Sequence, residues 1–176
     1  MQKLILSLSL LASVAAADAQ SQAQSPAQSS GQSQAQTSTQ SQAQAEAQKA
    51  RQLEEAKKAI LASNAIYSDL ANKDDGSILT RYTDDACLLP PNAAPVCGRE
   101  NIRQFFHGGP KVHSIFTIQN VYGDGKDFVT EESHYELFDL NNHKLDDGKV
   151  LVIWKKTKDG WKMYRDMFSS NHPPQH

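Results

Sequence analysis

The sequence lacks the motifs that identify several large enzyme classes. It contains no Gly-x-Ser-x-Gly nucleophile turn, no glycine-rich phosphate loop and no His-Glu-x-x-His metal motif. These absences argue against hydrolases with a nucleophile elbow, P-loop nucleotide hydrolases and zinc proteases. A concentration of positive charge is also missing: the formal net charge is −2 and Lys and Arg are scattered. The charge pattern therefore argues against a nucleic-acid partner.

Long hydrophobic runs are missing as well, apart from one short stretch at the start. Lys3 gives the chain a short basic start, and residues 4–14 are apolar except for small residues. Residues 17–19 have the small-x-small pattern that signal peptidase accepts. The apolar run is shorter than the roughly 20 residues that a spanning helix needs. We therefore predict a signal peptide over residues 1–19, a secreted protein, and no membrane association after cleavage.

Large apolar residues are absent from residues 20–48, which are almost entirely Gln, Ser and Ala. Such a segment buries too little surface to offset the entropy of ordering it. The sequence predicts a disordered linker over residues 20–48, one domain over residues 49–171, and a disordered tail over residues 172–176.

Cysteine is scarce, with only Cys87 and Cys97. They are equidistant from Asn92, the expected turn of a hairpin-like segment, so a folded hairpin would place them opposite one another. In an oxidising compartment this favours a disulfide. The alternative is two small buried residues that never meet. Since no CxxC pair or third ligand lies nearby, we predict no metal site.

Hydrophobic periodicity predicts helices first and strands afterwards. Apolar residues at three- and four-residue steps from Leu53 to Leu70 indicate an amphipathic helix that ends near Lys73. Two short helices are expected, at residues 77–82 and after Gly98, with a small strand at residues 86–89 between them. Long antiparallel strands are expected at residues 112–122, 128–138, 149–156 and 161–169. This order predicts an α+β domain in which a curved sheet wraps the long helix.

Several short segments together resemble a known superfamily. They are YTDDACLLPP at residues 82–91, GRENIRQFF at residues 98–106, and DGK, WKK, DGWK and RD between residues 147 and 166. The domain resembles the nuclear transport factor 2-like superfamily, and within it the SnoaL-like group that includes ketosteroid isomerase homologues. The resemblance implies a cone-shaped, cystatin-like domain with a cavity open at one end, and often a homodimer through the outer sheet face. Members isomerise, hydrolyse epoxides, cyclise, dehydrate or only bind ligands.

The ketosteroid isomerase mechanism does not transfer to this sequence. In that enzyme a carboxylate base acts with an oxyanion hole of Tyr and protonated Asp. The resemblance places the base position on Pro90, which cannot accept a proton, and the Tyr position near Ile66, one step from Tyr67.

Other residues are candidates for a site in the cavity. Glu131, Ser133 and Tyr135 alternate onto one strand face, opposite the face of His134. If the first face lines the cavity, Glu131 is a candidate base and Tyr135 a candidate donor. Alternatively, Tyr135 and Ser133 only pack in the core and Glu131 pairs with a Lys or Arg.

Arg165 and Asp166 are adjacent, so a strand would point them to opposite faces. An inward Arg165 would hold an anionic ligand or pair with Glu131, whereas an inward Asp166 is a candidate proton acceptor. The hydroxyls of Tyr67 and Tyr82 either reach the cavity or lie at the edge of the core.

Three hypotheses for function remain open. The first is a binding module for a small apolar or amphipathic ligand, which requires a cavity of several hundred cubic ångströms. The second is an isomerase, hydratase or hydrolase without a cofactor, which requires a buried carboxylate with a raised pKa in the cavity, at Glu131 or Asp166. The third is a structural or interaction protein whose cone is filled by side chains. None of the three calls for a metal or cofactor.

Overall fold

The computed structural model describes residues 27–173, with side chains from Ser38 onward. The chain divides into one unit over Met1–Gln40 and a second over Ser41–His176, and the second unit holds the sheet and the site. The predicted signal peptide and residues 174–176 of the predicted tail lie outside the described residues.

The first helix, α1 (Ala27–Ala65), begins well before Leu53, where the predicted amphipathic pattern starts. The predicted disorder of the linker is therefore not confirmed for residues 27–48, which are helical, while residues 20–26 lie outside the described part. The reason is compositional, because Ala and Gln have high helix propensity even where they bury nothing. Every described side chain from Ser38 to Arg51 is exposed.

The burial of α1 confirms the predicted amphipathic pattern from Leu53 onward. Ala56, Ile60 and Ser63 are buried at steps of four and three residues, whereas Leu61 between them is exposed. The expected single helix to Lys73 is interrupted at Ile66, and a separate turn of helix, α2 (Tyr67–Asn72), follows. One short helix, η1 (Ser77–Arg81), and α3 (Arg99–Phe106) complete the helical part.

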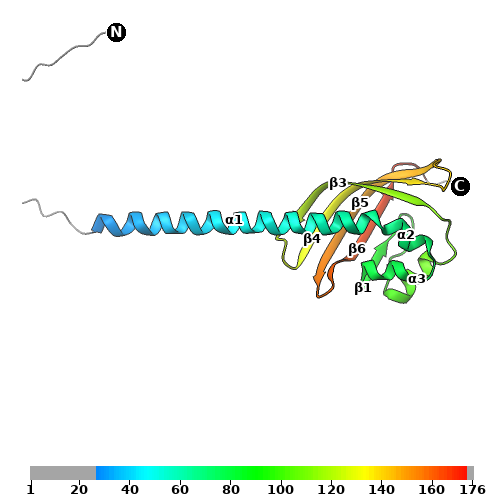
Figure 1. Ribbon diagram of the computed structural model, residues 1–176, viewed down its shortest axis with the longest axis horizontal. Coiled ribbons are helices and arrows are strands. Elements are labelled where there is room, and N and C mark those ends of the chain that lie inside the picture. The colour runs from blue at the N-terminus through cyan, green and yellow to red at the C-terminus, as the bar shows by residue number, and fades with distance from the viewer. Residues whose placement is uncertain (1–26, 174–176) are drawn as a thin grey trace, which may run out of the picture. The chain divides into compact units, whose positions relative to one another are not determined.

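The sheet is curved and has six strands. They are β1 (Tyr82–Leu89), β2 (Val96–Cys97), β3 (His113–Gly123), β4 (Phe128–Phe138), β5 (Lys144–Thr157) and β6 (Gly160–Ser170). Their order is β2-β1-β6-β5-β4-β3, antiparallel except for the parallel pair β1–β6. The C-terminal part of α1 lies across this sheet (Figure 1). The α+β class and the four long antiparallel strands are thus confirmed.

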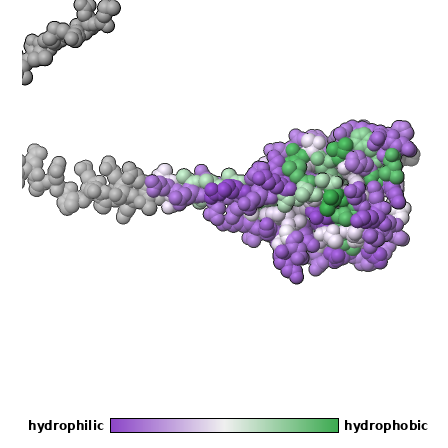
Figure 2. All heavy atoms as spheres, in the orientation of Figure 1, coloured by the Kyte–Doolittle hydropathy of each residue, from purple (hydrophilic) through white to green (hydrophobic). Residues whose placement is uncertain are grey.

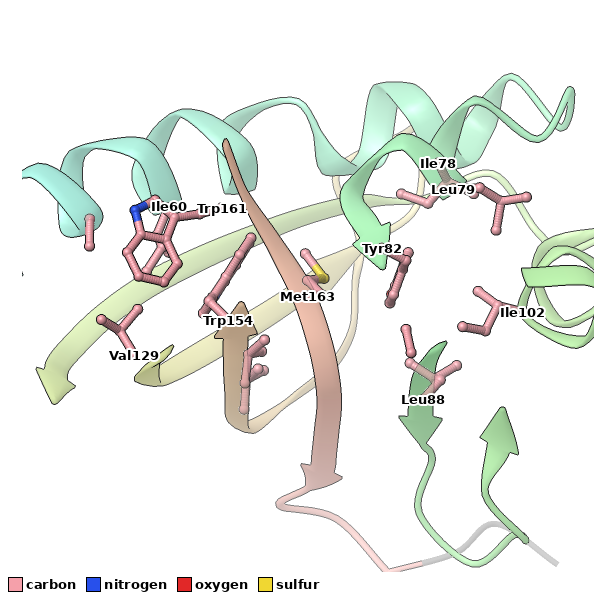
Figure 3. Packing of buried hydrophobic residues seen from close by; sticks show 14 of the residues in the cluster. Ile60, Ile78, Leu79, Tyr82, Leu88, Ile102, Val129, Trp154, Trp161 and Met163 are labelled. Atoms are coloured by element: carbon pink, nitrogen blue, oxygen red, sulfur yellow. The ribbon is translucent and has the colours of Figure 1, made fainter. Parts of the chain in front are cut away.

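The core forms between α1 and the inner face of the sheet. Val129, Trp154 and Met163 are cross-strand partners on β4, β5 and β6, and all three are buried. Figure 3 shows Trp154 and Trp161 directed from the strands toward the helix that carries Ile60. Both Trp residues therefore pack between sheet and helix.

The predicted disulfide between Cys87 and Cys97 is confirmed. The two residues are register partners on β1 and β2, which places them opposite one another across the hairpin. The bridge ties the edge strand β2 to the rest of the sheet.

We expect the disulfide to stabilise the domain by constraining the unfolded chain. Cross-linking residues ten positions apart removes loop entropy worth about 3 kcal/mol. The double substitution Cys87→Ser and Cys97→Ser should therefore lower the free energy of unfolding by about that amount, as measured by urea denaturation. An unchanged denaturation midpoint would contradict this expectation.

Candidate functional site

A cavity of about 420 Å³ lies between the inner face of the sheet and the helices. Its walls are mostly apolar, and its polar groups are concentrated on α1, α2 and the inner faces of β4, β5 and β6. The helices contribute Asn64, Tyr67, Ser68, Ala71, Asn72, Phe105 and Phe106, and the loop after α2 contributes Asp74. The strands contribute Leu88, Ser114, Phe116, Glu131, Tyr135, Leu137, Asp146, Val150, Val152, Met163, Asp166 and Phe168. The segment Gly109–Val112 completes the lining.

Two acidic side chains occupy one row across the inner face of the sheet. Val152 of β5 is the register partner of Glu131 on one side and of Asp166 on the other. Strand alternation therefore directs all three side chains to the same face, and Glu131 and Asp166 are 1% and 6% exposed. Both candidate carboxylates thus lie at the cavity wall.

Glu131 is held by three hydrogen-bond donors. Its Oε1 accepts from Asn64 Nδ2 at 2.8 Å and from Ser133 Oγ at 2.5 Å. Its Oε2 accepts from Trp154 Nε1 at 2.8 Å. The predicted alternative of a Lys or Arg partner is therefore wrong, because neutral donors from α1, β4 and β5 satisfy this buried carboxylate.

Asp166 has fewer partners than Glu131. Tyr82 donates its hydroxyl to Asp166 Oδ2 at 2.6 Å, while no described residue hydrogen-bonds to Oδ1. Burial raises the pKa of Asp166 to about 6, and the negative charge of Glu131 adds to the rise, against the opposing hydrogen bond from Tyr82. Asp166 therefore titrates close to neutral pH inside the cavity.

Tyr67 extends this hydrogen-bonded group to the helical wall. Its hydroxyl lies 3.3 Å from the hydroxyl of Tyr82. The interruption of the helix at Ile66, which is exposed, leaves Tyr67 at the start of α2 with its ring in the cavity wall. Burial, followed by the charge of Asp166, raises the pKa of both Tyr67 and Tyr82, so both hydroxyls stay protonated.

A second polar group lies farther along the same strands. Tyr135 donates its hydroxyl to Asp146 Oδ2 at 2.6 Å, and Ser170 donates to Asp146 Oδ1 at 2.7 Å. Burial works against ionisation of Asp146, but these two hydrogen bonds lower its pKa overall. The ring of Tyr135 covers Gly148 of β5. A side chain at position 148 would overlap both this ring and the carbonyl oxygen of Ser169. Tyr135 is thus fixed as a partner of Asp146.

The structure places the other predicted site residues as follows. Ser133 and Tyr82 are buried behind the cavity lining, where they support Glu131 and Asp166. Arg165 lies on the opposite face of β6, where it stacks on Tyr164 at 3.7 Å and donates to the carbonyl of Asp85. The predicted inward Arg165 and its ion pair with Glu131 are therefore wrong, because the register of β6 turns Asp166 inward instead.

Sequence reasoning missed three residues of the site: Asn64, Trp154 and Asp146. Asn64 follows buried Ser63 on α1, and no role at the site was predicted for Trp154. The alternation of β5 was a usable signal, since Trp154 shares its inward face with Val152. Within residues 38–173, no group of three or more His, Cys, Asp or Glu could hold a metal ion.

Solved structures share this fold, although no family model and no curated protein matches the sequence. A nuclear transport factor 2-like protein with a cystatin-like fold from Novosphingobium aromaticivorans aligns with a TM-score of 0.60 at 17% identity, over 69% of this chain and 86% of that one. A ketosteroid isomerase-like protein from Erwinia carotovora atroseptica aligns with a TM-score of 0.51 at 21% identity, over 65% and 96%. A domain of unknown function with a cystatin-like fold from Nostoc punctiforme has a TM-score of 0.56 at 14% identity, over 67% and 78%. The expected nuclear transport factor 2-like fold is thus confirmed.

We expect Asp166 to lower stability above neutral pH. The pKa of Asp166 rises from 3.8 in the unfolded chain to about 6 in the folded protein. Protonated Asp166 therefore stabilises the folded protein fully at a pH below the unfolded pKa, and this stabilisation is lost as pH rises through 6. The free energy of unfolding of Asp166→Asn, taken relative to that of the natural protein, should therefore rise by about 2–3 kcal/mol from pH 4 to pH 8. Urea denaturation at both pH values measures this difference.

The control for this measurement is Asp159→Asn, which changes an exposed carboxylate in the turn between β5 and β6. A stability difference between Asp166→Asn and the natural protein that is the same at pH 4 and pH 8 would contradict the raised pKa.

Proposed function

We propose that the domain binds a small, largely apolar ligand in the cavity, with Asp166 as the polar anchor. The observation that carries the proposal is a cavity of about 420 Å³ whose apolar walls converge on a few polar groups. Ligand pockets typically have this size and this mixture of lining groups. A cone filled by side chains would not leave such a volume, so the cavity argues against the third hypothesis.

The aromatic walls suit a ligand with a flat or chain-like apolar body. Tyr67 packs edge-on against Phe116 and Phe106, with ring centroids 5.4 and 6.2 Å apart. Phe168 of β6 packs in the same way against Tyr135 at 6.3 Å. These rings provide apolar surface next to the carboxyl of Asp166, which is the pattern that orients an amphipathic ligand.

The proposal includes secretion and a homodimer. The disulfide supports an oxidising compartment. Among the described helices, none combines the length and hydrophobicity of a membrane span.

The support for the dimer is an apolar pair on the outer face of the sheet. Leu151 and Met167 are register partners there and are 46% and 48% exposed. On the face shown in Figure 2, hydrophobic residues reach the surface in patches.

A second candidate function is proton-transfer catalysis without a cofactor. The observation that favours it is Asp166, a buried carboxylate whose pKa of about 6 suits a general base at neutral pH. Tyr67 and Tyr82 would supply neutral donors beside it. At the position corresponding to the ketosteroid isomerase base, Pro90 follows β1 and offers no proton acceptor, so Asp166 would have to serve as the base.

Filling the cavity should abolish ligand binding. Val150 lines the cavity and is buried, whereas its neighbour Leu151 points to the outer face. We expect the uncharged dye N-phenyl-1-naphthylamine to bind the natural protein one to one in a fluorescence titration. Val150→Phe should weaken binding at least about tenfold, equivalent to about 1.4 kcal/mol, and the matched control Leu151→Phe should not. Equal effects of both substitutions, or no binding, would contradict the proposal.

The catalytic candidate predicts exchange of an acidic C–H proton. Asp166 would remove an α-proton from a small ketone such as 2-indanone, and the enolate would take a deuteron from solvent. We expect exchange in D₂O, followed by proton NMR, to be faster with the natural protein than in buffer. Asp166→Asn should reduce the excess rate by about 100-fold or more, while Asp159→Asn retains it. Exchange at the buffer rate would reject this function and leave ligand binding intact.

A further inference from the structure

The charges around the cavity are almost all negative. Among the residues that line it, Glu131, Asp146 and Asp166 carry acidic groups on the sheet, and Asp74 lies at the rim beside His107. The one basic side chain in this lining is Lys111, which is exposed. Glu131 and Asp166 in the deeper wall therefore have no cationic partner among the described residues.

We propose that the ligand of this cavity carries a positive charge, as a protonated or quaternary amine attached to an apolar body. This inference rests on the proposed binding function and names the chemical class of its ligand. The geometry behind it is a buried carboxylate with one free oxygen in an aromatic-walled cavity. Among the described lining residues the basic one is Lys111, which is exposed and does not hydrogen-bond to this carboxylate.

Asp166 is the group that most needs a cation. Asp166 is only 6% exposed, and yet its Oδ1 has no hydrogen-bond partner among the described residues. The groups that face it are Glu131 on β4, Tyr82 on β1 and Tyr67 on α2, while its β5 neighbour is Val152. None of these supplies positive charge. A carboxylate removed from water in this way is stabilised by an opposite charge at close range.

The aromatic side chains near Asp166 fit the same ligand. Tyr67, whose hydroxyl contacts Tyr82, forms a wall with Phe106 and Phe116. The faces of such rings attract organic cations, and desolvation strengthens the attraction. An amine would therefore meet a carboxylate and aromatic surface together, whereas an anionic ligand in the same position would meet the like charge of Asp166.

The dependence of affinity on pH separates a cationic ligand from a neutral one. A cation binds the ionised form of Asp166, so its affinity should fall as pH drops through the raised pKa near 6. A neutral ligand that accepts a hydrogen bond from the protonated acid should instead bind more tightly at low pH. The change of affinity with pH therefore has opposite signs for a cationic and a neutral ligand.

The test compares three probes that share one carbon skeleton: 4-phenylbutylamine, 4-phenylbutan-1-ol and 4-phenylbutyrate. Isothermal titration calorimetry on the full chain at pH 7.5 should give the amine at least about tenfold tighter binding than the alcohol, with the carboxylate weakest. Lowering the pH to 5, one unit below the pKa, should weaken amine binding about tenfold. The amine itself stays protonated over this range.

Substitutions complete the test. Asp166→Asn should remove the advantage of the amine and its pH dependence but keep alcohol binding, and the exposed control Asp159→Asn should behave as the natural protein. Alcohol binding equal to or tighter than amine binding would overturn the inference, as would N-phenyl-1-naphthylamine binding without any of the three probes. Both results would leave the proposed function standing. If no probe and no dye binds, the proposed function fails as well.

Discussion

The structure of this site depends on two acids that the sheet holds in one row. Glu131 and Asp166 flank Val152, and the curved sheet with α1 above it removes both carboxylates from water. Two buried acids without a cation are costly unless hydrogen bonds or protonation compensate. The remaining features of the site follow from the hydrogen bonds and the protonation that offset this cost for each acid.

The two acids differ in how the free-energy cost of their burial is offset. Glu131 takes three donors, among them Trp154, the fully buried side chain at the centre of the core. The same indole therefore packs the core and satisfies the acid, which ties the polar site to the stability of the domain. Asp166 has one donor and retains a free oxygen toward the cavity, and this leaves it available to a ligand or a proton. A buried carboxyl whose pKa is raised by its surroundings, as that of Asp166 is, is typical of functional sites.

Local patterns predicted the elements well, because burial follows short periods. The strand over residues 128–138 and the common face of Glu131, Ser133 and Tyr135 came from alternation alone, whereas the direction of that face did not. Alternation also shows that Arg165 and Asp166 point apart, but which of them points inward depends on the register with β5, a long-range property. The pairing of Trp154 with Glu131 and the helix break at Ile66 likewise depend on tertiary packing. The early start of α1 depends on the propensity of Ala and Gln, which an argument from burial overlooks.

The most direct test of this account is the titration of Asp166 itself. In protein labelled with ¹³C at the aspartate carboxyls, the Asp166 signal is assigned by its disappearance in Asp166→Asn and followed from pH 3 to pH 9. The account predicts a midpoint near pH 6, raised by burial and by the charge of Glu131. A midpoint near the value of 3.8 expected for a solvated aspartate would contradict it.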